Sequence, residues 1–236
     1  MVGQLVLPSH IGFIIDGNRR WARDNRKKYP WDGHRAGAEA LDKTLENCMD
    51  LGIPQVSVYM LSTENLNREP REVGELFKLY YEYLKKWEEG KSGLLDKYEV
   101  HVRFAGDLNK LPPQLRELSG KIMQKTAKYQ KRFLNLMIAY GSQFELMEVM
   151  KKIAQKAVET GRIEVTAKDV EANLMVPVPL DLVVRTGGAY RLSNFMLWQA
   201  SYAELYVTKT LWPDFDRAEL MKAVRWYSST KRNFGK

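Results

Sequence analysis

Six short β-rich runs alternate with longer helical patterns along this chain of 236 residues, and this alternation restricts its fold more than any other feature. Strands are predicted at residues 10–16, 55–61, 100–106, 134–140, 181–186 and 203–208. Helices are predicted near residues 35–51, 72–89, 113–129, 143–159 and 217–231, with shorter turns near 168–174 and 194–200. Such alternation is typical of a mainly parallel sheet covered by helices on both faces. No linker-like stretch divides the chain, so we predict one α/β domain over residues 1–236, with a central six-stranded, mostly parallel sheet flanked by helices.

The loops at the carboxyl ends of the predicted strands carry the unusual residues. Ligands of open parallel sheets bind beyond those ends. The rule places Asp16, Ser62, Gly106, Gly141 and Arg185 on one rim. The rim loops read DGNRRW, STENLNR and RTGGAYRLSN, and none contains a Rossmann or P-loop glycine pattern. The rim therefore binds phosphate by another route, or does not bind it at all.

The first rim loop combines one acid with a dense group of cations. Asp16 ends an apolar strand and is followed by Gly17 and Asn18, a pattern that suits a hard cation near an anion but also suits an ordinary Asp-Gly turn. The cations that follow are Arg19, Arg20, Arg23, Arg26, Lys27 and Lys28. Guanidinium groups bind phosphate oxygens bidentately, although a solvated helix face or a nucleic-acid patch has the same composition. No aromatic-interleaved recognition motif accompanies the run, which disfavours nucleic acid.

The loop RTGGAYRLSN indicates a second anion site. Arg185, Arg191 and Ser193 surround the start of the apolar run NFMLWQA. Downstream, Glu204 lies inside a strand-like run, where a carboxylate is costly to bury unless it is paired or bound to metal. Asp16 and Glu204 are therefore candidate ligands of one cation. With three histidines and one cysteine, magnesium with water and a diphosphate is favoured over zinc.

Composition limits the partners and the compartment. The formal net charge of +8 indicates anionic partners. The single cysteine, Cys48, excludes an internal disulfide and fits a reducing cytoplasm. No window approaches the roughly 20 apolar residues that span a bilayer. The aromatic-rich run ELFKLYYEYLKKW is either core or the wall of a pocket for a long apolar group.

Two anion sites, one metal and an apolar wall describe an enzyme that handles two diphosphates with apolar tails. Over nearly its whole length the chain resembles the cis-prenyltransferases, whose type member is undecaprenyl diphosphate synthase. The matching segments are HIGFIIDGNRRWAR, GHRAG, STENLNR followed by EVGELF, LNLMIAYG, and DLVVRTGGAYRLSNFMLWQASYAELYVTKTLWPDF. The resemblance implies a homodimer with an apolar tunnel between sheet and helices. It also implies a magnesium-dependent condensation of isopentenyl diphosphate onto an allylic diphosphate, giving cis double bonds.

The resemblance also implies residue roles. Asp16 matches the family's essential acid, which binds magnesium at the allylic diphosphate, and Gly17, Asn18, Arg19, Arg20 and Trp21 match the loop around that diphosphate, with His34 nearby. Ser62, Thr63, Glu64, Asn65 and Leu66 match a loop between the substrates, which Arg68 follows. Arg185, Arg191, Leu192 and Ser193 match the grip on isopentenyl diphosphate, and Glu204 the second carboxylate that reaches the metal. The family pattern points to Asn65 as proton acceptor. An amide is hardly basic at neutral pH, so a substrate diphosphate oxygen is an equal candidate.

The chain departs from the family pattern at the substrate sites. Leu61 and Leu66 stand where the family usually has Phe and Trp, and Met60 stands where long-chain members have a small residue. Met60 would fill tunnel volume, so we predict a short to medium product, below undecaprenyl length. The C-terminus reads KRNFGK in place of the common Arg-x-Gly, with Asn233 at the arginine position, and one extra residue separates Trp21 from His34.

These departures leave a second reaction open, the irregular coupling of allylic diphosphates into branched products. A non-catalytic accessory subunit is expected to lose the acid or the arginines, which are all present. We expect a cytoplasmic enzyme whose membrane contact, where it occurs, is transient and peripheral.

Overall fold

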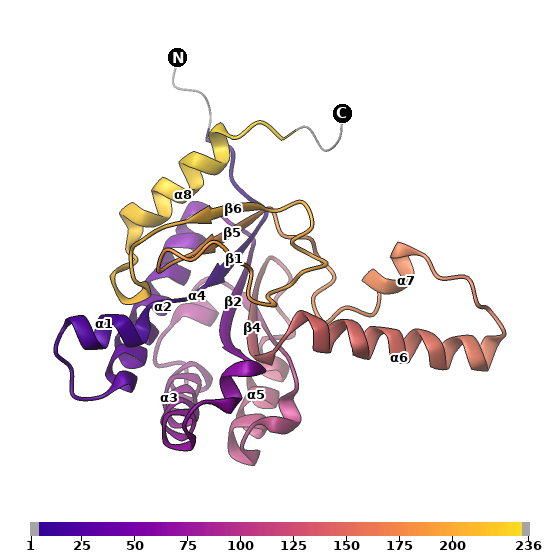
Figure 1. The fold of residues 1–236 in the computed structure, drawn as a ribbon, viewed down its shortest axis with the longest axis horizontal. Coiled ribbons are helices and arrows are strands. Elements are labelled where there is room, and N and C mark those ends of the chain that lie inside the picture. The colour runs from indigo at the N-terminus through magenta and orange to yellow at the C-terminus, as the bar shows by residue number, and fades with distance from the viewer. Residues whose placement is uncertain (1–4, 233–236) are drawn as a thin grey trace.

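The sheet has the predicted number of strands. The structure is a computed structural model that describes residues 5–232. Its strands are β1 (His10–Ile14), β2 (Gln55–Ser62), β3 (Val100–Ala105), β4 (Arg132–Tyr140), β5 (Leu182–Arg185) and β6 (Glu204–Val207). They follow the order β3-β4-β2-β1-β5-β6, and every pairing among them is parallel (Figure 1). The predicted α/β architecture is confirmed, with a sheet that is parallel throughout.

Eight α-helices connect and cover the strands of the described part of the chain. They are α1 (Asn18–Asp24), α2 (Pro30–Leu51), α3 (Pro70–Glu88), α4 (Leu94–Lys97), α5 (Pro113–Thr126), α6 (Ser142–Thr160), α7 (Ala167–Glu171) and α8 (Arg217–Ser229). Short 3-10 turns lie at Glu64–Asn67, Leu108–Lys110 and Trp212–Asp214. The five long helices were predicted. The short helices α1 and α4 were not, because neither has an apolar repeat long enough to indicate a helix.

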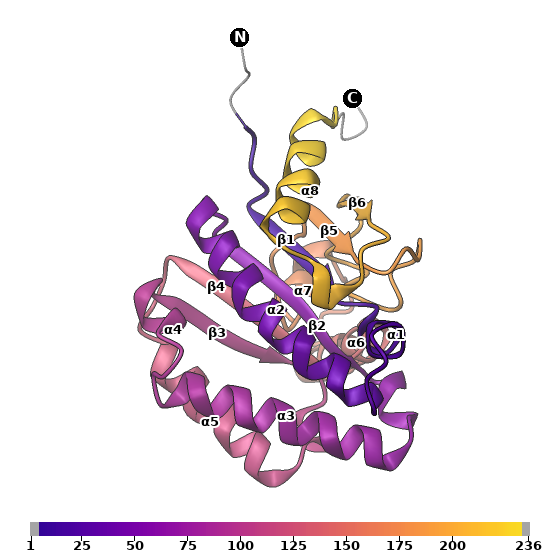
Figure 2. The ribbon, with the colours of Figure 1, turned by 90° about the vertical axis from the view of Figure 1, so that its left-hand side faces the viewer.

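The two faces of the sheet are covered differently. Ile11 and Phe13 point into a core shared with α2, α3, α5 and α8, and Figure 2 shows α2 crossing the sheet with α3 and α5 beside each other. Ile14 and Tyr59 point the other way, into a smaller core built with Val176, Phe195 and other residues of the irregular segment 174–203. The prediction of helical cover on both faces is therefore correct for one face, while irregular chain covers most of the other.

An irregularity in β2 aims one side chain toward the helices. The pairing with β4 shifts between Tyr59 and Leu61, and shifts back between Leu61 and Ser62. Met60 is thus an extra residue, and on β4 Ala139 has a φ of 50°. A bulge of this kind breaks the alternation of side chains along a strand. As a result Met60 and Leu61 both pack against the helix-side core.

Helix α6 extends away from the sheet (Figure 1). Only Ser142, Glu145 and Val149 are buried along its 19 residues. Met147 and Met150 are 54% and 57% exposed. Helix α6 therefore presents apolar side chains that this chain alone does not cover.

Within residues 5–232, no helix is both long and apolar enough to cross a membrane.

Candidate active site

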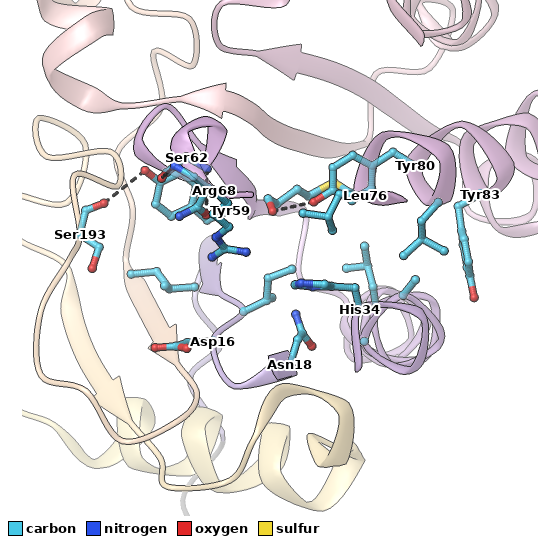
Figure 3. A pocket seen from close by; sticks show the side chains of 18 of the residues that line it. Asp16, Asn18, His34, Tyr59, Ser62, Arg68, Leu76, Tyr80, Tyr83 and Ser193 are labelled. Atoms are coloured by element: carbon cyan, nitrogen blue, oxygen red, sulfur yellow. Dashed lines mark hydrogen bonds between the residues drawn. The ribbon is translucent and has the colours of Figure 1, made fainter. Parts of the chain in front are cut away.

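Two adjoining cavities open at the carboxyl ends of β1, β2 and β5. The first has a volume of about 330 Å³ and lies between the sheet and helices α2 and α3. Its polar lining is Asp16, Asn18, His34, Ser62, Asn65, Arg68, Arg185, Arg191 and Ser193. Its apolar lining includes Leu41, Met60, Leu76, Leu79, Tyr80, Tyr83, Leu84 and Trp87. Figure 3 shows Asp16 and Ser193 at one end and Tyr80 and Tyr83 at the other, so the cavity has a charged mouth and an apolar interior.

The second cavity is rich in arginine. It has a volume of about 540 Å³ and shares Ile15, Asp16, Asn18, His34 and Arg68 with the first. The rest of its lining is Gly17, Arg19, Arg20, Arg23 and Pro30. Four guanidinium groups around one cavity favour an anion with several oxygens, because each group can donate two parallel hydrogen bonds.

The Asp16 carboxylate is held between Arg185 and Arg20. Its Oδ2 accepts a 2.9 Å bond from Nη2 of Arg185, and its Oδ1 a 3.2 Å bond from Nη2 of Arg20. The Asp16 side chain is still 32% exposed, whereas that of Arg185 is 4% exposed. The main-chain oxygen of Asp16 accepts from Thr186 Oγ1 at 2.7 Å and from Trp212 N at 3.1 Å. The carboxylate is therefore fixed in position and remains accessible to a ligand.

Gly17 makes this arrangement possible. Its φ is 114°, a left-handed conformation that side chains disfavour, and a Cβ there would lie 2.9 Å from Leu211 Cδ2. The chain can therefore turn directly from Asp16 into α1, which carries Arg19 and Arg20.

Arg185 joins Asp16 to the second predicted anion site. Its Nη1 donates to Ser193 Oγ at 2.7 Å and to the main-chain oxygen of Arg191 at 2.5 Å. Its Nε is buried and has no partner. Strands β1 and β5 are neighbours, which explains why residues 169 positions apart meet. One buried guanidinium thus links the two groups of residues that the sequence indicates for two diphosphates.

A buried carboxylate that the sequence analysis missed organises the cations at the mouth. Glu72 Oε1 lies 3.1 Å from Arg68 Nη1, 3.4 Å from His34 Nε2 and 3.8 Å from Arg19 Nε. Burial and the nearby Arg68 lower the pKa of His34 to about 4, so at pH 7 the ring is neutral and its Nε2–H donates to Glu72. The available signal was the spacing of Arg68 and Glu72, an arginine and an acid four residues apart at the start of α3.

The interior of the cavity is closed by large side chains of α3. Tyr80 Oη donates to the main-chain oxygen of Met60 at 2.8 Å, which fixes β2 against α3. Tyr83, Leu84 and Trp87 line the cavity further along the helix. A volume of about 330 Å³ is near the lower end of the roughly 300–1,000 Å³ typical of small-molecule pockets. The space suits a short apolar chain.

Several predicted site residues do not line either cavity: Trp21, Leu61, Thr63, Glu64, Leu66 and Leu192. Trp21 Nε1 donates to Asp214 Oδ1 at 2.7 Å, and Leu61 is 1% exposed within the helix-side core. Asn65 does line the cavity, and its main-chain N–H donates to Ser62 Oγ at 3.1 Å. The departure at the C-terminus begins within the described residues, but Asn233 lies outside them.

The predicted pairing of Asp16 with Glu204 is wrong within one chain. Glu204 begins β6 and is level with Leu182, whereas Asp16 follows the far end of β1, where Arg185 is level with Val207. Asp16 therefore lies at the carboxyl ends of the strands, whereas Glu204 lies at their amino ends. No group of three or more candidate metal-ligating side chains occurs among the described residues. Among the described lining residues Asp16 is the only acid, which fits magnesium held by one carboxylate, water and a diphosphate.

Comparisons with known proteins agree with this geometry. A family model described as "Putative undecaprenyl diphosphate synthase" matches residues 14–235. Two similar proteins are named tritrans,polycis-undecaprenyl-diphosphate synthase (geranylgeranyl-diphosphate specific). The one from Methanopyrus kandleri is 40% identical and the one from Methanocaldococcus jannaschii 41% identical; each alignment covers 98% of this chain, with 85% and 83% of those proteins.

Two solved structures are also similar. Lavandulyl diphosphate synthase from Lavandula x intermedia, in complex with dimethylallyl diphosphate, aligns with a TM-score of 0.92 and 29% identity over 98% of this chain and 99% of that one. A probable undecaprenyl diphosphate synthase from Campylobacter jejuni aligns with a TM-score of 0.80 and 31% identity over the whole of both chains.

Proposed function

We propose a function from one premise: this chain belongs to the undecaprenyl diphosphate synthase family, the cis-prenyltransferases. The chain is a prenyltransferase that condenses isopentenyl diphosphate with an allylic prenyl diphosphate to give a cis-polyprenyl diphosphate. The observation that carries this conclusion is Arg185, which contacts Asp16 on one side and Ser193 on the other. This contact supports two neighbouring anion-binding groups at the mouth of an apolar cavity.

We assign the allylic diphosphate to the arginine-rich cavity. Asp16, Arg19, Arg20 and Arg68 surround that space, and the neutral His34, whose Nε2–H donates to Glu72, also lines it. The apolar tail would enter the first cavity past Met60. Magnesium, held by Asp16 and the diphosphate, would supply positive charge as the diphosphate leaves. The arginines add fixed positive charge at the same place, which stabilises the developing anion.

We assign isopentenyl diphosphate to Arg185, Arg191 and Ser193. These groups would hold its double bond against the allylic carbon. The allylic C–O bond breaks, a carbon–carbon bond forms to C4 of isopentenyl diphosphate, and a proton leaves its C2. Asn65 lines the cavity next to Ser62, but an amide is too weak a base for this proton. We therefore propose a diphosphate oxygen of the substrate as the acceptor and Asn65 as a residue that positions it.

The irregular coupling of two allylic diphosphates remains the second candidate function. It is supported by the similarity to lavandulyl diphosphate synthase, whose structure contains dimethylallyl diphosphate. The departure from the family pattern at Leu61 gives irregular coupling little support, because the Leu61 side chain is buried and does not line the cavity. Regular condensation is favoured by the similarity to two proteins named undecaprenyl-diphosphate synthase, which are 40% and 41% identical over 98% of this chain.

The proposed reaction is tested by the fate of labelled isopentenyl diphosphate. We expect label to enter an organic-soluble product only when an allylic primer and magnesium are both present, and chelation by EDTA to abolish it. Primers of increasing length, from dimethylallyl diphosphate upward, would define the preferred substrate. Purified protein that incorporates no label with any primer would contradict the proposal.

We also propose that the enzyme is a homodimer formed through α6. Support comes from Met147 and Met150, which are exposed on this extended helix, and from Leu197 and Trp198, 37% and 36% exposed in the segment whose main chain binds Ser142 Oγ. Exposed apolar side chains gathered in this way mark interaction surfaces. We further propose a cytoplasmic location. The net charge of +8 supports transient peripheral contact with anionic membranes.

Light scattering tests the assembly. The wild type is expected at twice the 27.4 kDa mass of the chain, and Met150→Asp at the mass of one chain, because a buried unpaired charge opposes association. Gln155→Asp adds the same charge at an exposed polar position of α6 and is expected to remain dimeric. A monomeric wild type, or a Met150→Asp variant that stays dimeric, would refute this interface.

A further inference from the structure

The segment that presents Ser193 has an unusual backbone. Ser193, Asn194 and Met196 have φ values of 51°, 65° and 43°, in the left-handed region that residues with a side chain seldom occupy. Asparagine tolerates this region better than most residues. Because Ser193 Oγ receives the bond from Arg185, the shape of this segment decides where that hydroxyl stands. Neighbouring contacts therefore have to hold the segment in place.

Asn194 supplies three of those contacts. Its main-chain oxygen accepts from Ser142 N at 2.8 Å, and its side-chain Oδ1 accepts from Gln143 N at 2.9 Å. These are the first N–H groups of α6, which have no acceptor within the helix. Gly141, which precedes the helix, provides no side-chain cap. Asn194 thus caps α6 from a segment about 50 residues away.

The third contact reaches the loop between the proposed substrates. Asn194 Nδ2 donates to Glu64 Oε1 at 3.0 Å. Although burial acts to raise the pKa of Glu64, hydrogen bonds from its own main chain and from Asn194 outweigh it and hold the pKa below its usual range. Glu64 does not line either cavity, so its carboxylate faces Asn194 instead of the substrate space. Ser62 and Asn65, on either side of it in sequence, do line the cavity.

The space between Gly141, Thr63 and the Asn194 side chain is tightly packed. A Cβ on Gly141 would lie 2.6 Å from Asn194 Nδ2 and 2.8 Å from Thr63 Oγ1. Tyr59 Oη donates to the main-chain oxygen of Ser193 at 3.2 Å, which fixes the same segment from the sheet. The ends of β2 and β4, the start of α6 and the Ser193 segment therefore form one packed unit around the Asn194 side chain.

We propose that Asn194 is a positioning residue for the isopentenyl diphosphate site, joining Ser193 to the Ser62–Asn65 loop and to the first turn of α6. The inference rests on the proposed function. Asn194 touches neither cavity and acts through Ser193 and Glu64. Glu64 accordingly serves as the anchor of its loop. The residue also connects the substrate site to α6, the helix proposed to form the dimer, so a displacement of that helix reaches Ser193 directly.

A double-mutant cycle tests the Asn194–Glu64 bond. Asn194→Asp keeps the acceptor for Gln143 N but sets two carboxylates against each other. We expect it to weaken the binding of isopentenyl diphosphate, measured by calorimetry without primer, by roughly 10- to 100-fold. In a Glu64→Gln background the same change is expected to cost less than about threefold, because the amide introduced in place of the Glu64 carboxylate can donate to the new carboxylate. Asn109→Asp, at an exposed position outside the site, is the control.

The readouts separate positioning from a general loss of folding. The KM for isopentenyl diphosphate is expected to rise in Asn194→Asp while the KM for the allylic primer changes little, and melting temperatures identify variants that merely unfold. Equal binding by wild type and Asn194→Asp, or an equal loss in both Glu64 backgrounds, overturns the inference and leaves the proposed function standing. A wild type that binds isopentenyl diphosphate without turning it over contradicts the proposed function, while the cycle still tests the inference. A wild type that does not bind it contradicts both.

Discussion

Asp16→Asn is expected to lower kcat/KM for the condensation by about 1,000-fold, without loss of the fold. Asparagine has nearly the shape of aspartate but no charge. It cannot balance Arg20 and Arg185 or hold a divalent cation beside the leaving diphosphate. Steady-state rates at saturating magnesium measure the effect. Added magnesium is not expected to restore activity, because the substitution removes the ligand itself.

Asp24→Asn provides the matched control. Asp24 ends α1, the short helix that follows Asp16; its side chain is 53% exposed and pairs with Arg23 at 3.1 Å. Exposed pairs of this kind contribute at most about 1 kcal/mol to stability. The control is expected to stay within twofold of the wild-type rate. Activity within tenfold of wild type in Asp16→Asn, or an equal loss in both variants, would contradict the assignment of Asp16.

The second large effect concerns product length. Met60→Ala is expected to lengthen the main product by at least one isoprene unit, because Met60 lines the cavity where the β2 bulge turns it toward α3. The substitution removes side-chain volume and leaves the main-chain oxygen that accepts from Tyr80. Tyr83 and Trp87, further along α3, would then limit the chain. Chromatography of the dephosphorylated products measures the length.

Met49→Ala separates this effect from the general cost of a cavity. Met49 is 2% exposed in the helix-side core and does not line the substrate space. Its truncation is expected to reduce the free energy of unfolding by about 2–5 kcal/mol and to leave the product unchanged. An unchanged product from Met60→Ala would remove the argument that this residue limits chain length.

The sequence was sufficient to predict the strands and the rim. Period and composition located all the strands of the described sheet, and the rim rule brought Asp16 and Arg185 to the same edge. The predicted pairing of Glu204 with Asp16 is wrong within one chain because it was argued from the cost of burying a charge. The place of Glu204 at the beginning of a strand already indicated the amino ends of the strands, away from Asp16. The same positional rule, applied to every strand-end residue, would have avoided the error.

Other features depend on contacts between distant segments. The bulge at Met60 arises from the pairing of β2 with β4, and neither run shows it alone. Asn194 caps a helix that begins 52 residues earlier, so no local capping pattern reveals it. Glu72 resembles an ordinary acid in the first turn of α3 until the fold brings His34 and Arg19 against it.

The connectivity of the product tests the central claim most directly. Purified protein would be incubated with magnesium, labelled isopentenyl diphosphate and each primer in turn, and separately with dimethylallyl diphosphate alone. Branching and double-bond geometry would be determined by nuclear magnetic resonance. Linear products with new cis double bonds, formed only with isopentenyl diphosphate, are predicted. Branched products formed from dimethylallyl diphosphate alone would contradict the account and assign the irregular reaction to this site.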